Sequence, residues 1–263
     1  MSLEVKPIVK IKIDNLVVEV YRSREEMGKA AAAFTAAVVQ KLLTKKQQIN
    51  MAFAAAPSQN EFLDCLVTMS SIKWEFIRAF HLDEYLGLPF EAPQRLSQYL
   101  RKKLFDRVPF MEVHYIVPES KATPEEICAR YRELLDRYPL HIACIGIGEN
   151  GHIAFNDPPV ADFCDPCKVK VVRLDETCRR QQVNDGCFAT LDKVPTHAIT
   201  LTIPAIMEAK TIVCVVPGRR KREAIKRALE GPITTECPAS ILRTHQHATL
   251  FLDSESASLI LGR

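Results

Sequence analysis

The sequence lacks a long hydrophobic run, a signal-like N-terminus and an excess of charge of one sign. No uninterrupted apolar stretch approaches the roughly 20 residues that span a bilayer, and the opening "MSLEVKPIVKIKIDN" contains no apolar signal core. The formal net charge is only +3, which indicates no dedicated polyanion partner. We therefore expect a cytoplasmic protein that neither binds nucleic acid nor inserts into a membrane.

Paired metal-binding motifs are also missing. The nine cysteines are scattered, and "CDPC" at Cys164–Cys167 has no second CxxC or histidine pair nearby to complete a zinc site. His245 and His247 in "THQH" precede an apolar strand and are interpreted as structural or rim residues. We therefore expect free thiols in a reducing compartment, no metal and no cofactor.

No repeat, low-complexity tract or linker divides the chain, so we expect one domain over residues 1–263. Short apolar strands alternate with helical segments, which predicts an α/β fold of three layers. Its sheet should be mainly parallel, doubly wound and Rossmann-like, with helices on both faces. The expected strands are 16–23, 49–56, 74–82, 112–117, 141–147, 168–174, 196–202, 211–217 and 248–253. The expected helices are 24–46, 59–69 (capped by Ser58 or Asn60), 92–108, 123–138 and 218–231.

Ligands of such sheets bind at the carboxyl ends of the strands, and the first polar cluster at such an end is "HLDEYLGLP", residues 81–89. Successive strand side chains point to opposite faces, so Asp83 and Glu84 should not both enter one site. We expect one of them to be catalytic and the other structural. The alternative is a solvated acidic turn.

The second cluster is "GIGENGHIAFNDPP", residues 146–159, directly after a buried strand. Its glycines, Gly148 and Gly151 among them, permit a tight turn and a close approach of backbone N–H groups to an anion or a polar sugar. His152 has a pKa range suited to proton transfer, and Asp157 is near enough in sequence to orient or charge-balance it.

The third cluster is "VVPGRRKREAI", residues 215–225, where a strand leads through a turn into a helix. A helix N-terminus attracts anions, and the basic residues 219–222, which include Lys221, add positive charge. This pattern predicts a phosphate site, with a solvated basic helix face as the alternative.

Together, "LDEYLGLP", "GIGENGHIAFNDPP", "PGRRKREAI" and "CPASILRTHQHATLFLD" resemble the glucosamine-6-phosphate deaminase (isomerase) family, in order along nearly the whole chain. The related 6-phosphogluconolactonases share the fold, but typically have Thr-Ala-Ser after the Gly-His core. The resemblance implies conversion of an amino-sugar phosphate to a ketose phosphate and ammonia. It also implies site roles: Asp83 as the base, His152 in ring opening with Asp157 as its partner, Lys221 on phosphate and Arg179 on substrate.

Two departures make the chain a divergent member. Asn150 stands where the family usually has aspartate, and an amide orients an imidazole without stabilising its charge. At the end of the second strand, "AAAPSQ" replaces the family's Thr-Gly-Gly/Ser-Thr phosphate loop, and a proline there removes a backbone donor. Ser58 and Gln59 remain as donors to phosphate.

The resemblance therefore favours a deaminase-like enzyme whose ligand is a small sugar phosphate, and we allow for a homo-oligomer. One alternative is a 6-phosphogluconolactonase or an isomerase of another sugar phosphate. Lactone hydrolysis needs an activated water, whereas deamination needs a base that removes a proton from carbon. A second alternative is a non-catalytic sugar-phosphate-binding regulator. It would need a protein partner, because no DNA-binding helix-turn-helix fits before the first strand.

Overall fold

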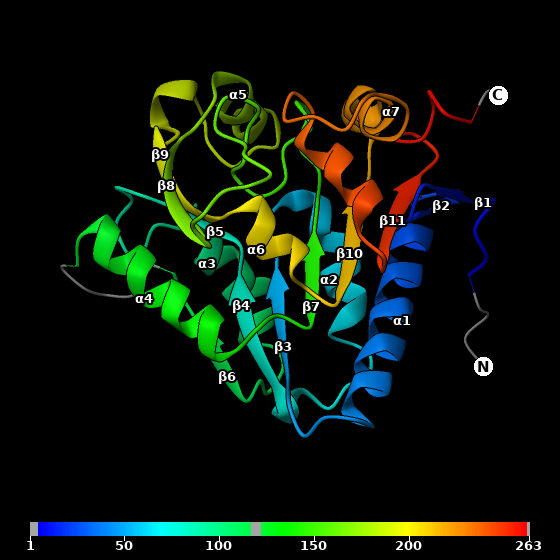
Figure 1. Ribbon diagram of the computed structural model, residues 1–263, viewed down its shortest axis with the longest axis horizontal. Helices are drawn as coiled ribbons and strands as arrows, with labels where there is room; N and C mark the ends of the chain where they lie inside the picture. The colour runs from blue at the N-terminus through cyan, green and yellow to red at the C-terminus, as the bar shows by residue number, and fades with distance from the viewer. Residues whose placement is uncertain (1–4, 117–121, 262–263) are drawn as a thin grey trace.

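The computed structural model describes residues 5–116 and 122–261, and its main feature is an eight-stranded sheet in the order β1-β2-β11-β10-β7-β3-β4-β6 (Figure 1). The β1–β2 pair is antiparallel, and the other neighbours are parallel. The strands are β1 Val9–Ile13, β2 Leu16–Tyr21, β3 Ile49–Phe53, β4 Ile77–His81, β6 Glu112–His114, β7 Ile142–Ile145, β10 Thr211–Val216 and β11 Ala248–Asp253.

Helices cover both faces of this sheet, as the predicted doubly wound α/β fold requires. One face packs on α1 (Arg24–Leu43), α2 (Asn60–Leu66) and α3 (Leu96–Leu100), and the other on α4 (Pro124–Arg137), α6 (Ile203–Met207) and α7 (Arg222–Glu230). Figure 1 shows α4 and α6 in front of the sheet and α2 and α3 behind it. Every residue of β3, β7 and β11 is buried, because both faces of these strands are covered.

Two of the expected strands lie outside the main sheet. β8 (Val169–Arg173) and β9 (His197–Leu201) pair antiparallel with each other, and β9 pairs antiparallel with β5 (Asp83–Tyr85). Exposed side chains interrupt the buried ones along β8, which is typical of an antiparallel sheet with one face toward solvent. This second sheet lies near α5 (Glu176–Asn184), toward the end of the molecule to which β3, β4 and β7 point (Figure 1).

Several expected boundaries differ from the structure. Strand 74–82 begins with a 3-10 turn at Trp74–Phe76, and helix 92–108 shortens to α3 followed by a π-helix at Arg101–Phe105. Ser58 and Asn60 do not cap α2, because a 3-10 turn occupies Pro57–Gln59 and the chain enters the helix already in helical conformation. Residue 117, the expected end of strand 112–117, lies outside the described residues.

Other boundaries are confirmed, and four elements were not expected, of which β5 and α6 have only three and five residues. Thr123 forms the capping box of α4 with Glu126. The other two unexpected elements are β1, a largely exposed edge strand, and α5, a strongly polar helix. Neither has the buried apolar stripe on which sequence periodicity depends. In the described part of the chain, no helix has the length and apolar character needed to cross a membrane.

A buried carboxylate fixes the point where the chain passes from β4 into β5. Glu84 has no solvent exposure, and it accepts hydrogen bonds from the backbone N–H groups of Tyr85 (2.9 Å), Leu96 (3.0 Å) and Ser97 (3.0 Å). The Ser97 hydroxyl also donates to it, and the Arg95 guanidinium lies 3.4 Å away. Glu84 thus holds β5 against α3, which leaves its neighbour Asp83 facing the opposite side.

We predict that Glu84→Gln lowers the free energy of unfolding by about 3 kcal/mol, because the amide brings donors to a position surrounded by donors and leaves Arg95 without its counterion. Urea denaturation measures the loss. The control is Glu61→Gln, which breaks a partly exposed pair with Arg24 (3.0 Å) and should cost below about 1 kcal/mol. Equal small losses in both variants would show that Glu84 does not anchor β5.

Candidate active site

A pocket of about 510 Å³, part of it open to solvent, lies at the carboxyl ends of three neighbouring strands. Its wall includes the segment after β3, Asp83 after β4 and the glycine loop after β7. This is the position at which doubly wound sheets bind ligands. The lining residues are Ala54–Ala56, Ser58, Gln59, Asp83, Leu96, Gly146–Gly148, His152, Ala154, Phe155, Gln181 and Gln182.

Asp83 presents an unpartnered carboxylate to this pocket. The side chain is 7% exposed, and it makes no hydrogen bond or ion pair with any residue that the structure describes. Burial, reinforced by the negative charges of Glu84 and Asp157, raises the pKa of Asp83 to about 8. A buried carboxyl with no protein partner is suited to exchange a proton with a bound molecule near neutral pH.

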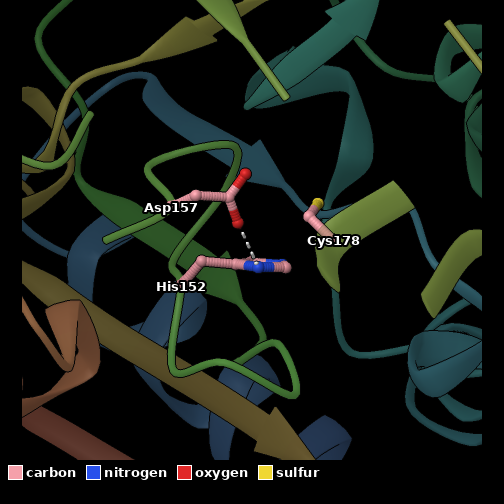
Figure 2. A group of neighbouring side chains, drawn as sticks. All are labelled: His152, Asp157 and Cys178. Atoms are coloured by element: carbon pink, nitrogen blue, oxygen red, sulfur yellow. Dashed lines mark ion pairs between the residues drawn. The ribbon is translucent and has the colours of Figure 1, made fainter. Parts of the chain in front are cut away.

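His152 enters the same pocket with one ring nitrogen held from behind. Its Nδ1 lies 2.9 Å from Asp157 Oδ1 (Figure 2). The same nitrogen lies 2.8 Å from Asn150 Oδ1. Both neighbours accept hydrogen bonds, so Nδ1 carries the proton and Nε2 of the neutral ring is left as the free acceptor. The predicted pairing of His152 with Asp157 is therefore present in the structure.

Asn150 links the two members of this pair. Its side-chain amide donates to Asp157 Oδ1 (2.9 Å), while its Oδ1 accepts from the backbone N–H of His152 (3.1 Å). Burial acts to raise the pKa of Asp157, but His152 and the hydrogen bonds from Asn150 and the Asp175 backbone outweigh it and lower that pKa. Asp157 is thus the charged residue beside His152, and Asn150 is a neutral residue that donates a hydrogen bond to it.

The two predicted ligand-binding glycines have packing roles in the structure. The N–H of Gly148 donates to His152 O (2.9 Å) and that of Gly151 to Gly148 O (3.1 Å), so neither is free for an anion. A Cβ on Gly148, which lines the pocket, would lie 2.1–2.3 Å from the His152 ring. Gly151 does not line the pocket: its φ is +92°, and a Cβ there would lie 2.8 Å from Cys237 Sγ. Both positions need glycine to keep the loop compact behind His152.

Ser58 and Gln59 line the pocket, as expected from the segment after β3. The Gln59 amide nitrogen donates to Val215 O (3.1 Å) and lies 3.3 Å from Ser58 Oγ. This amide is held between β3 and β10, where a Cβ on Gly146 would come within 3.0 Å of it. The segment therefore offers neutral polar groups in place of a nest of backbone donors.

Lys221 and Arg179, the predicted phosphate- and substrate-binding cations, differ in their surroundings. Lys221 is 6% exposed, and its side-chain ammonium makes no hydrogen bond or ion pair with any described residue. Burial lowers its pKa, against the opposing effect of Asp185 and Glu149. The Arg179 guanidinium donates to the backbone oxygens of Leu191 (2.7 Å) and Val194 (2.8 Å). Arg179 lines a separate hollow beside the pocket, because these two carbonyls hold its side chain there.

The sequence reasoning missed three residues that α5 brings to the site. Gln181 and Gln182 line the pocket, and Gln181 Oε1 accepts from the backbone N–H of Glu149 (2.9 Å). Cys178 faces His152 and Asp157 (Figure 2), and the ligand atoms of the three lie within 4.8 Å of one another. The available signal was Asp175, whose side chain caps α5 by accepting from Thr177 N (3.0 Å).

His, Asp and Cys are residue types that bind zinc. In this structure Nδ1 of His152 is already paired with Asp157, and Cys178 lies beside the pair. The expectation that the protein needs no metal stays a prediction.

The raised pKa of Asp83 predicts a pH-dependent cost to stability. A carboxyl with a pKa of about 8 when folded and about 3.8 when unfolded stabilises the native state at low pH, and this contribution is lost as the pH rises from about 4 to 8. Asp83→Asn should therefore gain stability over the parent protein as the pH rises from about 5 to 8, measured by urea denaturation. The exposed Asp162→Asn is the control and should give a difference that stays flat. A flat difference for Asp83→Asn would contradict the raised pKa.

Comparison with known proteins shows the relationship. A sequence model of the family described as glucosamine-6-phosphate isomerases/6-phosphogluconolactonase matches residues 22–165 and 166–251. A glucosamine-6-phosphate deaminase of Listeria monocytogenes serotype 4a (strain HCC23) is 36% identical over 224 residues, which are 85% of this chain and 92% of that protein. A glucosamine-6-phosphate deaminase of Exiguobacterium sibiricum is 42% identical over 184 residues, 70% of this chain and 71% of that protein.

Solved structures agree with the sequence comparison. A structure described as a monomeric glucosamine-6-phosphate deaminase superimposes with a TM-score of 0.83 at 29% identity, covering 92% of this chain and 99% of that one. The 6-phosphogluconolactonase of Thermotoga maritima, at 19% identity and a TM-score of 0.73, covers 90% of this chain and 99% of its own and shares the fold. The expected resemblance is confirmed: the chain belongs to the family of glucosamine-6-phosphate isomerases and 6-phosphogluconolactonases.

Proposed function

We propose that the protein converts an amino-sugar phosphate of the glucosamine 6-phosphate type, with water, to a ketose phosphate and ammonia. The observation that carries the proposal is the Asp83 carboxylate, which is buried, has no protein partner and shares one pocket with His152. The names of the relatives at 36% and 42% identity support the same reaction.

The first step in the proposal is opening of the sugar ring by His152. The free Nε2 accepts the proton of the C1 hydroxyl and returns a proton to the ring oxygen, which gives the open-chain aldehyde. Asp157 holds the opposite nitrogen and stabilises the imidazolium that forms between the two transfers. The loop glycines keep the ring in place, since any side chain at Gly148 would occupy the space of the imidazole.

The second step is transfer of the C2 proton to C1 by Asp83. A carboxylate with a pKa of about 8 is a stronger base than an ordinary aspartate, and its protonated form is stabilised by the same burial. Asp83 must be ionised at the start of this step. A substrate ammonium near it favours that form, because an opposite charge lowers the pKa of a carboxyl. The transfer moves the C2 proton to C1 and an ammonium proton to the C1 oxygen, which leaves an iminium at C2. Water then adds to C2 and the C–N bond breaks, which gives ammonia and the ketose.

Phosphate binding is assigned to Lys221 in this proposal. Lys221 is 6% exposed, and its ammonium has no ion pair in the described structure. An incoming anion would supply the missing counterion. Lys221 directly precedes α7, whose N-terminal N–H groups favour the same charge. The Ser58 hydroxyl on the pocket wall adds a neutral donor, whereas the Gln59 amide is already bonded to Val215 O and Ser58 Oγ.

An ammonia-release assay tests the proposal directly. Glucosamine 6-phosphate, unphosphorylated glucosamine and other amino-sugar phosphates should be compared under one set of conditions. We expect ammonia and a ketose phosphate from a phosphorylated amino sugar, and little from glucosamine itself because Lys221 would lack its anion. Hydrolysis of 6-phosphogluconolactone without ammonia release from any amino sugar would overturn the proposal in favour of a lactonase.

We further predict that the residues at 150 and 157 act as a matched pair. Asn150→Asp would place a second carboxylate 2.9 Å from Asp157 Oδ1 and remove its hydrogen bond donor, so turnover should fall about tenfold or more. Asp157→Glu alone should also lose activity, because the added methylene moves the carboxylate relative to His152. Activity is measured as kcat/KM for ammonia release. The fraction of activity that remains in the double variant should exceed the product of the fractions that remain in the two single variants. Losses that simply multiply would show that the two positions are independent.

A further inference from the structure

Three side chains at the candidate active site have the composition of a zinc site. His152, Asp157 and Cys178 each offer one ligand atom, and these atoms lie within 4.8 Å of one another (Figure 2). In the described part of the chain, no other three histidine, cysteine, aspartate or glutamate side chains come together in this way. We propose that these three residues bind Zn²⁺ and that the bound ion inhibits the enzyme. The inhibition rests on the proposed function, whereas the binding of zinc does not.

The ligand types favour zinc over harder ions. An imidazole nitrogen, a thiolate sulfur and a carboxylate oxygen are the ligands that Zn²⁺ prefers in proteins, whereas Mg²⁺ and Ca²⁺ prefer sets of oxygens. Three protein ligands leave the fourth tetrahedral position for a water molecule. A complex of Zn²⁺ with one thiolate, one carboxylate and a neutral imidazole has no net charge. Burying this complex therefore costs much less than burying an uncompensated ion.

The distances are close to those that zinc requires. Zinc bonds of about 2.0–2.3 Å in a tetrahedron place neighbouring ligand atoms about 3.3–3.6 Å apart. His152 Nδ1 and Asp157 Oδ1 are 2.9 Å apart. The Cys178 sulfur lies within 4.8 Å of its two partners, so a shift of about 1 Å brings it into range.

Hydrogen bonds hold the segments that carry the three ligands together. Asp157 accepts from the Asn150 amide (2.9 Å) and from the backbone N–H of Asp175 (3.2 Å). Asp175 is the N-cap of α5, and Cys178 lies in the first turn of that helix. The bond from Asp175 therefore ties the helix that carries the thiol to the loop that carries His152. A ligand set that is already assembled loses little conformational entropy when the ion binds.

The candidate active-site pocket gives the ion access to the first ligand. His152 lines this pocket and is 8% exposed, whereas Asp157 and Cys178 are at most 1% exposed. An ion in the pocket therefore meets the imidazole before the two ligands that become or remain anionic. Since those two are buried, we expect zinc to bind and dissociate slowly, and the protein should be incubated with the ion before any assay.

Bound zinc would remove the group that opens the sugar ring. If the ion takes Nδ1 of His152, the proton of the neutral ring moves to Nε2, which can then no longer accept the proton of the C1 hydroxyl. If the ion takes Nε2, the same lone pair is used directly. Burial keeps the Cys178 thiol protonated by raising its pKa, and this proton goes to solvent when the sulfur binds zinc. One proton is therefore released for each ion bound.

Metal binding can be measured without any substrate. The protein should bind one equivalent of Zn²⁺ in competition with a chromophoric chelator. With Co²⁺ in place of Zn²⁺, it should show the near-ultraviolet charge-transfer absorption that a thiolate ligand produces. Cys178→Ser should lose this absorption and bind zinc at least about a hundredfold more weakly, because even partners that only orient metal ligands contribute about tenfold to hundredfold. The control Cys164→Ser, which changes an exposed thiol, should match the parent protein in both measurements.

Inhibition is measured as ammonia release from glucosamine 6-phosphate after incubation with Zn²⁺. We expect zinc to abolish release by the parent protein, EDTA to restore it and Mg²⁺ to have no effect. Each variant is compared with its own rate without zinc. The zinc concentration that halves this rate should rise at least about tenfold in Cys178→Ser and stay unchanged in Cys164→Ser.

The outcomes separate this inference from the proposed function. If the parent protein with Co²⁺ shows no thiolate absorption, or if Cys178→Ser binds zinc as tightly as the parent, the zinc site is wrong, whatever the ammonia assay gives. Loss of zinc binding in Cys164→Ser alone would place the ion at the CDPC motif and also overturn the site. If zinc binds through Cys178 without slowing ammonia release, the inhibition is wrong. If zinc binds through Cys178 but the zinc-free protein releases no ammonia, the site stands and the deaminase reaction fails.

Discussion

The structure of the site depends on the hydrogen bonds that surround Glu84. This carboxylate accepts from the first turn of α3 and from β5, and it thereby fixes the three residues of β5 at the end of β4. Because successive side chains on a strand point to opposite sides, Asp83 then faces the candidate active-site pocket. One buried structural acid therefore places the carboxylate that we propose as the base.

The charges of the site are separated by their surroundings. Asp157 has three hydrogen-bonding neighbours and a lowered pKa, whereas Asp83 has no protein partner and a raised one. Two carboxyls in one site thus differ in their readiness to take a proton, which is the arrangement that proton transfer requires. Asn150 belongs to this arrangement, because an aspartate in its place would compete with Asp157 for the same proton and the same histidine.

The sequence predicted those parts of the site that are local or follow from strand geometry. His152 and Asp157 are close because only four residues of one tight loop separate them, and strand alternation predicted the division between Asp83 and Glu84. The sequence could not predict which residues α5 brings to the site, because that depends on how α5 packs on the loop. These residues are Gln181, Gln182 and Cys178. Family resemblance gave Arg179 its place in the chain but not the direction of its side chain, which two backbone carbonyls determine.

The central claim is that Asp83 removes a proton from carbon, and hydrogen exchange at C2 of the sugar phosphate in D₂O measures that step without requiring release of ammonia. The parent protein should incorporate solvent deuterium at C2 of glucosamine 6-phosphate or at C1 of the product, detected by proton NMR. Asp83→Asn, which keeps the shape of the side chain but cannot accept the proton, should lose this incorporation while still binding the alditol of glucosamine 6-phosphate, an open-chain analogue that cannot react. Incorporation that persists in Asp83→Asn would contradict the account, because another group would then be the base.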